Sequence, residues 1–124
     1  MSEQILVVDD EPVVRQLAAR VLREEGFRVH EAVDGEEALD LIRDGFAHLD
    51  VVLSDIVMPR MNGVQLLQSL STLRPNLPVI LMSGYGTAQL AERDIVTPCG
   101  VLGKPFSREA LVAEVRRCIR SLLA

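Results

Sequence analysis

Five side chains in this sequence have the chemistry needed to handle a phosphate group, and each lies at the end of a short apolar run. They are the carboxylates of Asp9, Asp10 and Asp55, the hydroxyl of Ser83 and the ammonium group of Lys104. The runs before them are Ile5–Val8, Val51–Ser54, Val79–Met82 and Val101–Gly103, each short enough to be a buried strand. In an open parallel α/β sheet, ligands bind at the edge formed by the carboxyl ends of the strands. We therefore expect the five side chains to share one pocket.

Three carboxylates in one small pocket would repel one another unless their pKa values rise or a cation lies among them. Oxygen ligands without histidine or cysteine favour Mg²⁺, which takes one or two carboxylates together with phosphate oxygens. Aspartate acts as a covalent nucleophile in phosphoryl transfer, and lysine is a good point charge for phosphate. We interpret Asp55 as the nucleophile, Asp10 as a direct metal ligand and Asp9 as holding a metal-bound water. Lys104 would neutralise charge, and Ser83 would donate a hydrogen bond to a phosphate oxygen.

Taken singly, each of these residues has a simpler explanation. An aspartate after a strand is usually a turn residue or a helix cap, Lys104–Pro105 fits a surface turn, and Ser83 fits the start of a turn. Their joint occurrence at four strand ends favours the shared pocket.

The elements that would position this pocket follow from alternating strand and helix patterns. Helical spacing of apolar residues covers about residues 12–26, 35–45, 63–73, 88–93 and 107–122, with Pro12 at a favoured first position and Ser107 as a cap. The uniformly apolar runs predict central strands, whereas the alternation in residues 27–32 predicts an edge strand. The whole pattern predicts a flavodoxin-like, three-layer α/β/α fold, with five helices and a five-stranded parallel sheet in the order 2-1-3-4-5.

Length and composition narrow the possible functions. The chain has 124 residues, and we expect residues 1–124 to form a single domain. A net charge of -5 and an aromatic content of 3% argue against direct binding to nucleic acid. No apolar run approaches the length of a membrane span, and the polar Met1–Gln4 is unlike a signal peptide. Cys99 and Cys118 lack metal-like spacing, and we interpret both as free thiols of a cytoplasmic protein.

Four stretches resemble the receiver domain of two-component response regulators, and the resemblance covers essentially the full chain. They are ILVVDDEP at 5–12, LSDIVMPRMNG at 53–63, VILMSGYG at 79–86 and GKPF at 103–106, of which the second is the most specific. The resemblance implies that Asp55 is the phosphoacceptor and that Asp9 and Asp10 are the acidic metal-binding pair. It also implies that the backbone carbonyl of Val57 is a third protein ligand to Mg²⁺.

The resemblance assigns roles to two further residues. Ser83 corresponds to the Ser/Thr hydroxyl that moves toward the phosphoryl group, and Lys104 corresponds to the lysine of the family's active site. The Lys104–Pro105 peptide bond is expected to be cis, a conformation that only proline adopts at low cost.

The same resemblance implies a signalling module rather than an enzyme acting on other substrates. A histidine kinase or a histidine phosphotransfer domain would donate the phosphoryl group from a phosphohistidine, in a phosphorelay. The receiver would catalyse the transfer to itself and then change conformation. Docking of this partner is expected near Pro12, Val13, Gln16, Pro105 and Phe106, and a weak homodimer is a further expectation.

Three features bear on how such a domain would signal. The family usually has an aromatic residue three positions before the lysine, where this chain has Val101, so we expect signalling without an aromatic rotamer switch. Residues 86–100 correspond to the segment that forms the family's usual output face, and in this chain the segment is slightly short and weakly helical. An apolar Val57 cannot orient a hydrolytic water, and Tyr85 would cover the phosphoryl group, which together predict a long-lived acyl phosphate.

Other functions and other contexts stay open at this point. The chain fits a separate regulator, or a C-terminal receiver module of a hybrid sensor histidine kinase. An aspartyl-phosphate phosphohydrolase would usually have a second aspartate two residues after the nucleophile, at the position of Val57, and a cap domain. A flavin-binding module would need aromatic residues and a Ser/Thr/Gly-rich loop in place of Asp9-Asp10-Glu11.

Overall fold

The computed structural model describes residues 3–45, 48–84 and 98–123. Within these residues the five strands are β1 (Gln4–Val8), β2 (Arg28–Ala32), β3 (Val51–Asp55), β4 (Val79–Ser83) and β5 (Gly100–Gly103). The described helices are α1 (Pro12–Glu24), α2 (Gly35–Asp44), α3 (Gly63–Leu73) and α4 (Arg108–Leu123). All neighbouring strands pair in parallel, in the order β2-β1-β3-β4-β5. The predicted fold class and strand order are therefore confirmed.

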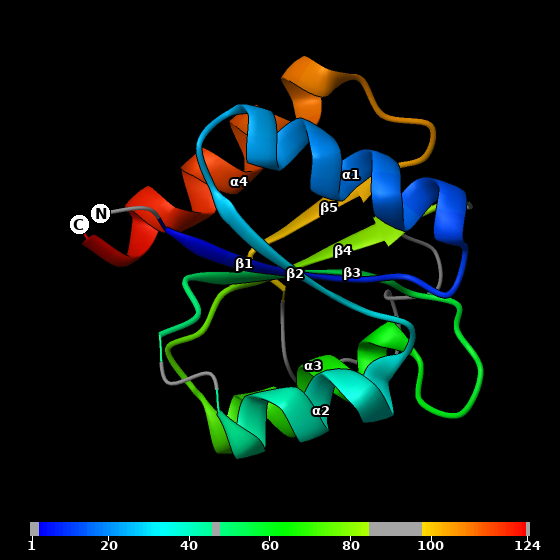
Figure 1. Ribbon diagram of the computed structural model, residues 1–124. Helices are drawn as coiled ribbons and strands as arrows, with labels where there is room; N and C mark the ends of the chain where they lie inside the picture. Colours follow the sequence, from blue (N-terminus) through cyan, green and yellow to red (C-terminus); the bar gives the residue numbers. More distant parts are fainter. Residues whose placement is uncertain (1–2, 46–47, 85–97, 124) are drawn as a thin grey trace.

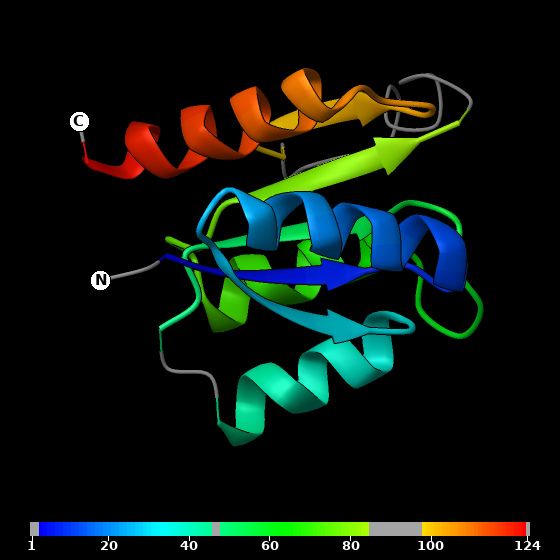
Figure 2. The same ribbon diagram turned by 45° about the horizontal axis from the view of Figure 1, so that its top comes forward.

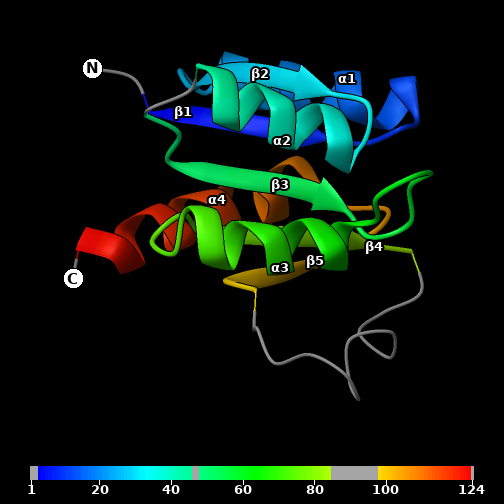
Figure 3. The same ribbon diagram turned by 90° about the horizontal axis from the view of Figure 1, so that it is seen from below.

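The sheet forms the middle of three layers. Helices α1 and α4 cover one face and helices α2 and α3 cover the other, as Figures 1 and 3 show from two directions. Successive residues of β1 contribute to opposite faces, with Ile5 and Val7 packed on the side of α1 and α4, and Leu6 and Val8 packed on the side of α2 and α3. Burial on both faces explains why the central strands read as continuous apolar runs.

Local signals in the sequence set several helix ends. Pro12 occupies the first turn of α1, and Gly26, with a φ of 98°, follows the end of that helix. The side chain of Asp34 caps α2 by accepting a hydrogen bond from the Glu37 amide, and Ser107 accepts one from the Ala110 amide at the start of α4. The predicted roles of Pro12 and Ser107 are confirmed.

The helix predicted over residues 88–93 lies outside the described residues, as does Tyr85. Among the helices that are described, none combines the length and the apolar character needed to cross a bilayer.

The prediction that Cys99 and Cys118 are free thiols is wrong, because the two residues form a disulfide. Cys99 directly precedes β5, and Cys118 is a buried residue of α4. Helix α4 runs back along β5, which brings the two Cα atoms to 6.0 Å from each other. Spacing along the chain carried no sign of this contact, since the partners are 19 residues apart and belong to different layers of the fold.

Candidate functional site

The parallel register brings the predicted site residues to one edge of the sheet. The arrowheads of the strands point to the same side of the molecule in Figure 2. Val8 pairs with Ser54 and Asp55 pairs with Met82, so the residues that end β1, β3 and β4 lie at similar heights. Beyond the last paired positions, the Lys104 amide donates to the carbonyl of Ser83 over 2.8 Å, which extends the ladder between β4 and β5.

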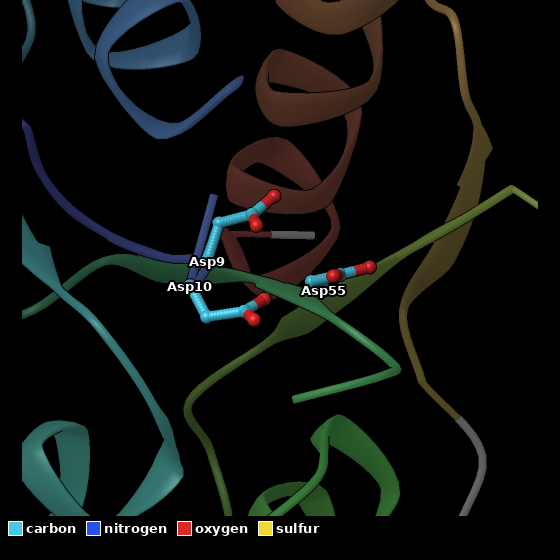
Figure 4. A group of neighbouring side chains, drawn as sticks. All are labelled: Asp9, Asp10 and Asp55. Carbon is cyan, nitrogen blue, oxygen red and sulfur yellow. The ribbon is translucent and has the colours of Figure 1, made fainter. Parts of the chain in front are cut away.

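Three carboxylates converge at this edge. One oxygen from each of Asp9, Asp10 and Asp55 can be chosen so that all three lie within 4.8 Å of one another, and Figure 4 shows the side chains gathered there. Asp9 and Asp55 are buried, whereas Asp10 is exposed. The donors are all oxygen atoms, which is the ligand set of a hard divalent cation, so the residues present fit Mg²⁺.

Lys104 lies between two of these carboxylates. Its Nζ atom donates to Oδ2 of Asp9 over 2.9 Å and is 3.3 Å from Oδ1 of Asp55. The other oxygen of Asp9, Oδ1, accepts a hydrogen bond from the Glu11 amide over 2.9 Å. Asp9 is therefore held by two partners, while Asp10 forms no ion pair with Lys104.

Burial and neighbouring charge shift the pKa values of the two central groups. Burial and the negative charge of Asp9 raise the pKa of the Asp55 carboxyl, and the ammonium group of Lys104 opposes this only in part. Burial alone would lower the pKa of Lys104, but the hydrogen bond to Asp9 and the charges of Asp55 and Asp9 outweigh it and raise that pKa. Lys104 thus stays cationic, and a further cation would help Asp55 to stay anionic.

The carboxylates open into a cavity of about 370 Å³ that a small anion could enter. Its lining residues are Asp10, Glu11, Asp55, Ile56, Val57, Ser83, Gly84 and Lys104. Among these lining residues Ser83 is buried, whereas Val57 is 56% exposed. Asp10, Asp55, Val57, Ser83 and Lys104 therefore share one cavity. Asp9 was expected in the same pocket, but it is fully buried and contacts the cavity's Lys104 instead of lining it.

Two residues that support this site were not singled out from the sequence. A Cβ atom added at Gly63 would overlap the carbonyl oxygen of Asp55 and would lie 3.0 Å from Cα of Ile56, so only glycine lets α3 begin this close to Asp55. Arg15 reaches from α1 to the carbonyl of Asp9 over 2.9 Å and to Glu31 over 3.2 Å. A glycine in the first turn of a helix, where other residues are better formers, was the one sequence signal for Gly63.

The peptide bond between Lys104 and Pro105 is cis, as expected. With this geometry established, comparison with known proteins identifies the family, because a family model of the response regulator receiver domain matches residues 5–116. The chain belongs to this family. Aspartyl phosphorylation and magnesium binding are general features of such receiver domains, and the acidic cavity fits both.

Several relatives show where such domains occur. The chain is 38% identical over 120 residues to the sensor kinase CckA of Brucella abortus, covering 95% of this chain and 13% of that protein. It is 36% identical over 123 residues to the response regulator MprA of a Mycobacterium species, covering 97% of this chain and 52% of MprA. The receiver domain of NtrX from Brucella abortus has a similar structure, with a TM-score of 0.85, 33% identity and coverage of 94% and 98% of the two chains.

The chain spans only part of the length of these curated relatives, about half in one case and about an eighth in the other. Because a sensor kinase and a response regulator both contain a region similar to this chain, the similarity does not favour the hybrid-kinase context over a response regulator.

Proposed function

We propose that Asp55 of this receiver domain accepts a phosphoryl group from a phosphohistidine of a histidine kinase or a phosphotransfer domain. The observation that carries the proposal is the position of Lys104 Nζ, 2.9 Å from Asp9 and 3.3 Å from Asp55, beside three carboxylates that converge on one cavity. An aspartate beside a lysine and an acidic cation site is the arrangement that a covalent phosphoryl acceptor needs.

The transfer forms one bond and breaks one. An Oδ atom of Asp55 forms a new P–O bond while the P–N bond of the donor breaks, and the electron pair of that bond goes to the ring nitrogen. When the other ring nitrogen carries a proton, the donor leaves as neutral imidazole. Lys104 remains beside Asp55 throughout and offsets the negative charge that would otherwise repel the incoming phosphoryl group.

Asp10, Asp9 and the backbone carbonyl of Val57 are the groups that would hold Mg²⁺, together with Asp55 itself. Asp10 would bind the ion directly, whereas Asp9, already held by Lys104 and the Glu11 amide, would hold a metal-bound water. The ion would supply charge neutralisation at the phosphoryl oxygens. Together with Lys104, the ion would offset the negative charge of the carboxylates that would otherwise repel the donor's phosphoryl group.

Ser83 would bind the new acyl phosphate by donating a hydrogen bond from its hydroxyl group to a phosphoryl oxygen. Shifting the ratio of active to inactive conformations from 1:99 to 99:1 requires about 5.5 kcal/mol of differential stabilisation. Charge-assisted hydrogen bonds from Ser83 and Lys104 would supply part of this free energy. With Val101 partly buried in β5 in place of an aromatic residue, this change would proceed without a ring changing its exposure.

The setting of the module is part of the proposal. We take residues 1–124 as one receiver domain that works in the cytoplasm and has no catalytic activity beyond its own phosphorylation and dephosphorylation. Pro12, Val13 and Gln16 are exposed on the first turns of α1, and Pro105 is exposed after β5. Their exposure supports docking of the phosphodonor protein on these residues together with half-buried Phe106.

The decisive experiment is incubation with Mg²⁺ and acetyl phosphate, followed by measurement of the intact mass. The wild-type chain is expected to gain one phosphoryl group, and Asp55→Asn is expected to gain none. Omitting Mg²⁺ should also prevent the gain. Phosphorylation of the Asp55→Asn variant at the wild-type rate would refute the assignment of the acceptor.

A further inference from the structure

Asp34 is a buried carboxylate that the phosphoacceptor site does not use. It lies after β2, only 1% exposed, and its Oδ1 atom accepts a hydrogen bond from the Glu37 amide to cap α2. Its Oδ2 atom accepts a hydrogen bond from the guanidinium group of Arg60, 26 residues further along the chain. A helix cap needs only one of the two oxygens, so the second oxygen is available to hold another part of the chain.

Arg60 lies at the middle of the loop that joins Asp55 to α3. It is the only described residue other than glycine with a positive φ, at 66°, a backbone conformation that is unfavourable for a residue with a Cβ atom. Strained conformations of this kind persist where surrounding contacts fix them, and they are found often at functional sites. The Arg60 side chain is 60% exposed, and of its ion pairs with Asp34 and Glu36 only the one with Asp34 reaches a buried group. We take that pair as the contact that fixes the conformation.

The loop is held at more than one point. At its start the Ile56 amide donates to the carbonyl of Met82 over 3.1 Å, and at its end the Gly63 amide donates to the carbonyl of Ile56 over 2.9 Å. Next to Arg60, Met61 packs so closely on the first residue of α2 that a Cβ atom added at Gly35 would lie 2.8 Å from Met61 Cγ. The loop is thus closed at its base and attached at its apex to the start of α2.

We propose that Arg60, acting through Asp34, is a positioning residue that fixes the loop of residues 56–62 and thereby places the backbone of Val57 at the metal site. This inference rests on the proposed function, because it takes the Val57 carbonyl as a ligand to Mg²⁺. Val57 lies between the closed base of the loop and its apex, and because the residue is 56% exposed, burial of its side chain does not anchor it. The position of the Val57 carbonyl therefore depends on the contacts that hold the loop on either side of it. Among these contacts, the Asp34–Arg60 pair is the ion pair.

The test measures Mg²⁺ binding without any phosphodonor, by amide chemical-shift changes in the isotope-labelled full chain. Arg60→Gly removes the guanidinium group but suits a positive φ, whereas Arg60→Ala removes the same group and keeps the strain. Asp34→Asn keeps an oxygen to cap α2 and removes the charge that Arg60 binds. Glu36→Gln is the matched control, since exposed Glu36 also contacts Arg60, at 3.4 Å, but does not tie the loop to a buried group.

We expect Arg60→Gly and Asp34→Asn to raise the Kd for Mg²⁺ by about tenfold, the lower end of the loss seen when a group that supports a metal ligand is removed. Arg60→Lys should lose less affinity for Mg²⁺, because lysine retains the positive charge. Glu36→Gln should bind Mg²⁺ as the wild type does. Unfolding by urea in EDTA is measured in parallel, because a merely structural tie would lower stability without changing the Kd.

An unchanged Kd for Mg²⁺ in both Arg60→Gly and Asp34→Asn, whatever their stability, would overturn the proposal. If Arg60→Gly does not fold, Asp34→Asn decides the same question, because it retains the cap of α2. Wild-type chain that binds Mg²⁺ but gains no phosphoryl group from acetyl phosphate would refute the proposed function and leave this inference standing. Wild-type chain that binds no Mg²⁺ would overturn this inference.

Discussion

Asp10 is the exposed member of the acidic cluster, and we predict that replacing it by asparagine stabilises the metal-free protein. Two unit charges 4.8 Å apart, the largest separation within the cluster, repel by about 0.9 kcal/mol in water and by about 3.5 kcal/mol at an effective dielectric constant of 20. Lys104 offsets the charges of Asp9 and Asp55 but forms no ion pair with Asp10. Because Asp10 is exposed, its share of the repulsion lies toward the lower value, and we expect a gain of about 1–2 kcal/mol.

The assay is unfolding by urea in EDTA, followed by the same measurement in Mg²⁺. A ligand at a hundred times its Kd adds about 2.7 kcal/mol to the stability of the folded state. Wild-type protein should gain this amount, whereas Asp10→Asn lacks the proposed direct ligand and should gain much less, so the order of the two stabilities should reverse. Asp40→Asn, an exposed change of the same kind on α2, controls for the loss of one negative charge from a chain of net charge -5.

Two results would refute this reasoning. One is an Asp10→Asn variant that is less stable than the wild type in EDTA, and the other is an equal gain from Mg²⁺ in both proteins. High salt provides a further check, because screening should shrink the gain in EDTA as the Debye length falls to about 3 Å at 1 M.

Four other outcomes are expected. Val57→Asn should shorten the lifetime of the acyl phosphate by about tenfold, because a polar side chain at this position can orient water. This factor is smaller than the rate enhancement that a full general base provides. An unchanged rate of decay would contradict the prediction. Reduction of the Cys99–Cys118 disulfide should lower the free energy of unfolding by about 3 kcal/mol, as expected for a loop of this length, with the Cys99→Ser variant insensitive to reductant. Gly63→Ala should lower stability by about 2 kcal/mol in urea unfolding, because the added Cβ atom overlaps a backbone carbonyl. Since burial and Asp9 raise the pKa of Asp55, the folded state binds that proton more tightly than the unfolded state. Stability in EDTA should therefore fall as pH rises from about 4, and Asp55→Asn should lack this fall.

Much of the site could be predicted because the strands have a recognisable hydrophobic pattern in the sequence. Continuous apolar runs such as Ile5–Val8 must be buried on both faces, which fixes them as central strands, and the right-handed crossover places their carboxyl ends together. Once the strand order is set, the meeting of Asp9, Asp55 and Lys104 follows from register alone. The structure confirms the strand order, and it places Lys104 in contact with both Asp9 and Asp55 at the carboxyl edge of the sheet.

Contacts that depend on side chains from different layers could not be predicted in this way. The disulfide requires the packing of α4 along β5, and neither Cys99 nor Cys118 has a neighbour in sequence that signals it. The Asp34–Arg60 pair joins two loops, and an arginine in a loop reads as a solvated charge until its partner is seen to be buried. Residue periodicity specifies which face of an element is apolar, but it does not specify which long side chains will meet across a loop.

Gly63 has a mechanical consequence for the whole domain. On the side of α2 and α3, the Asp55 carbonyl lies against the start of α3, and Arg60 binds the loop apex to Asp34, so this half stiffly supports the proposed phosphoacceptor. On the other side Ser83 is joined through the Lys104 amide to β5, and Cys99 ties the start of β5 to α4. A pull on the Ser83 hydroxyl should therefore displace β5 and α4 together as a single block, while the α2–α3 half stays in place.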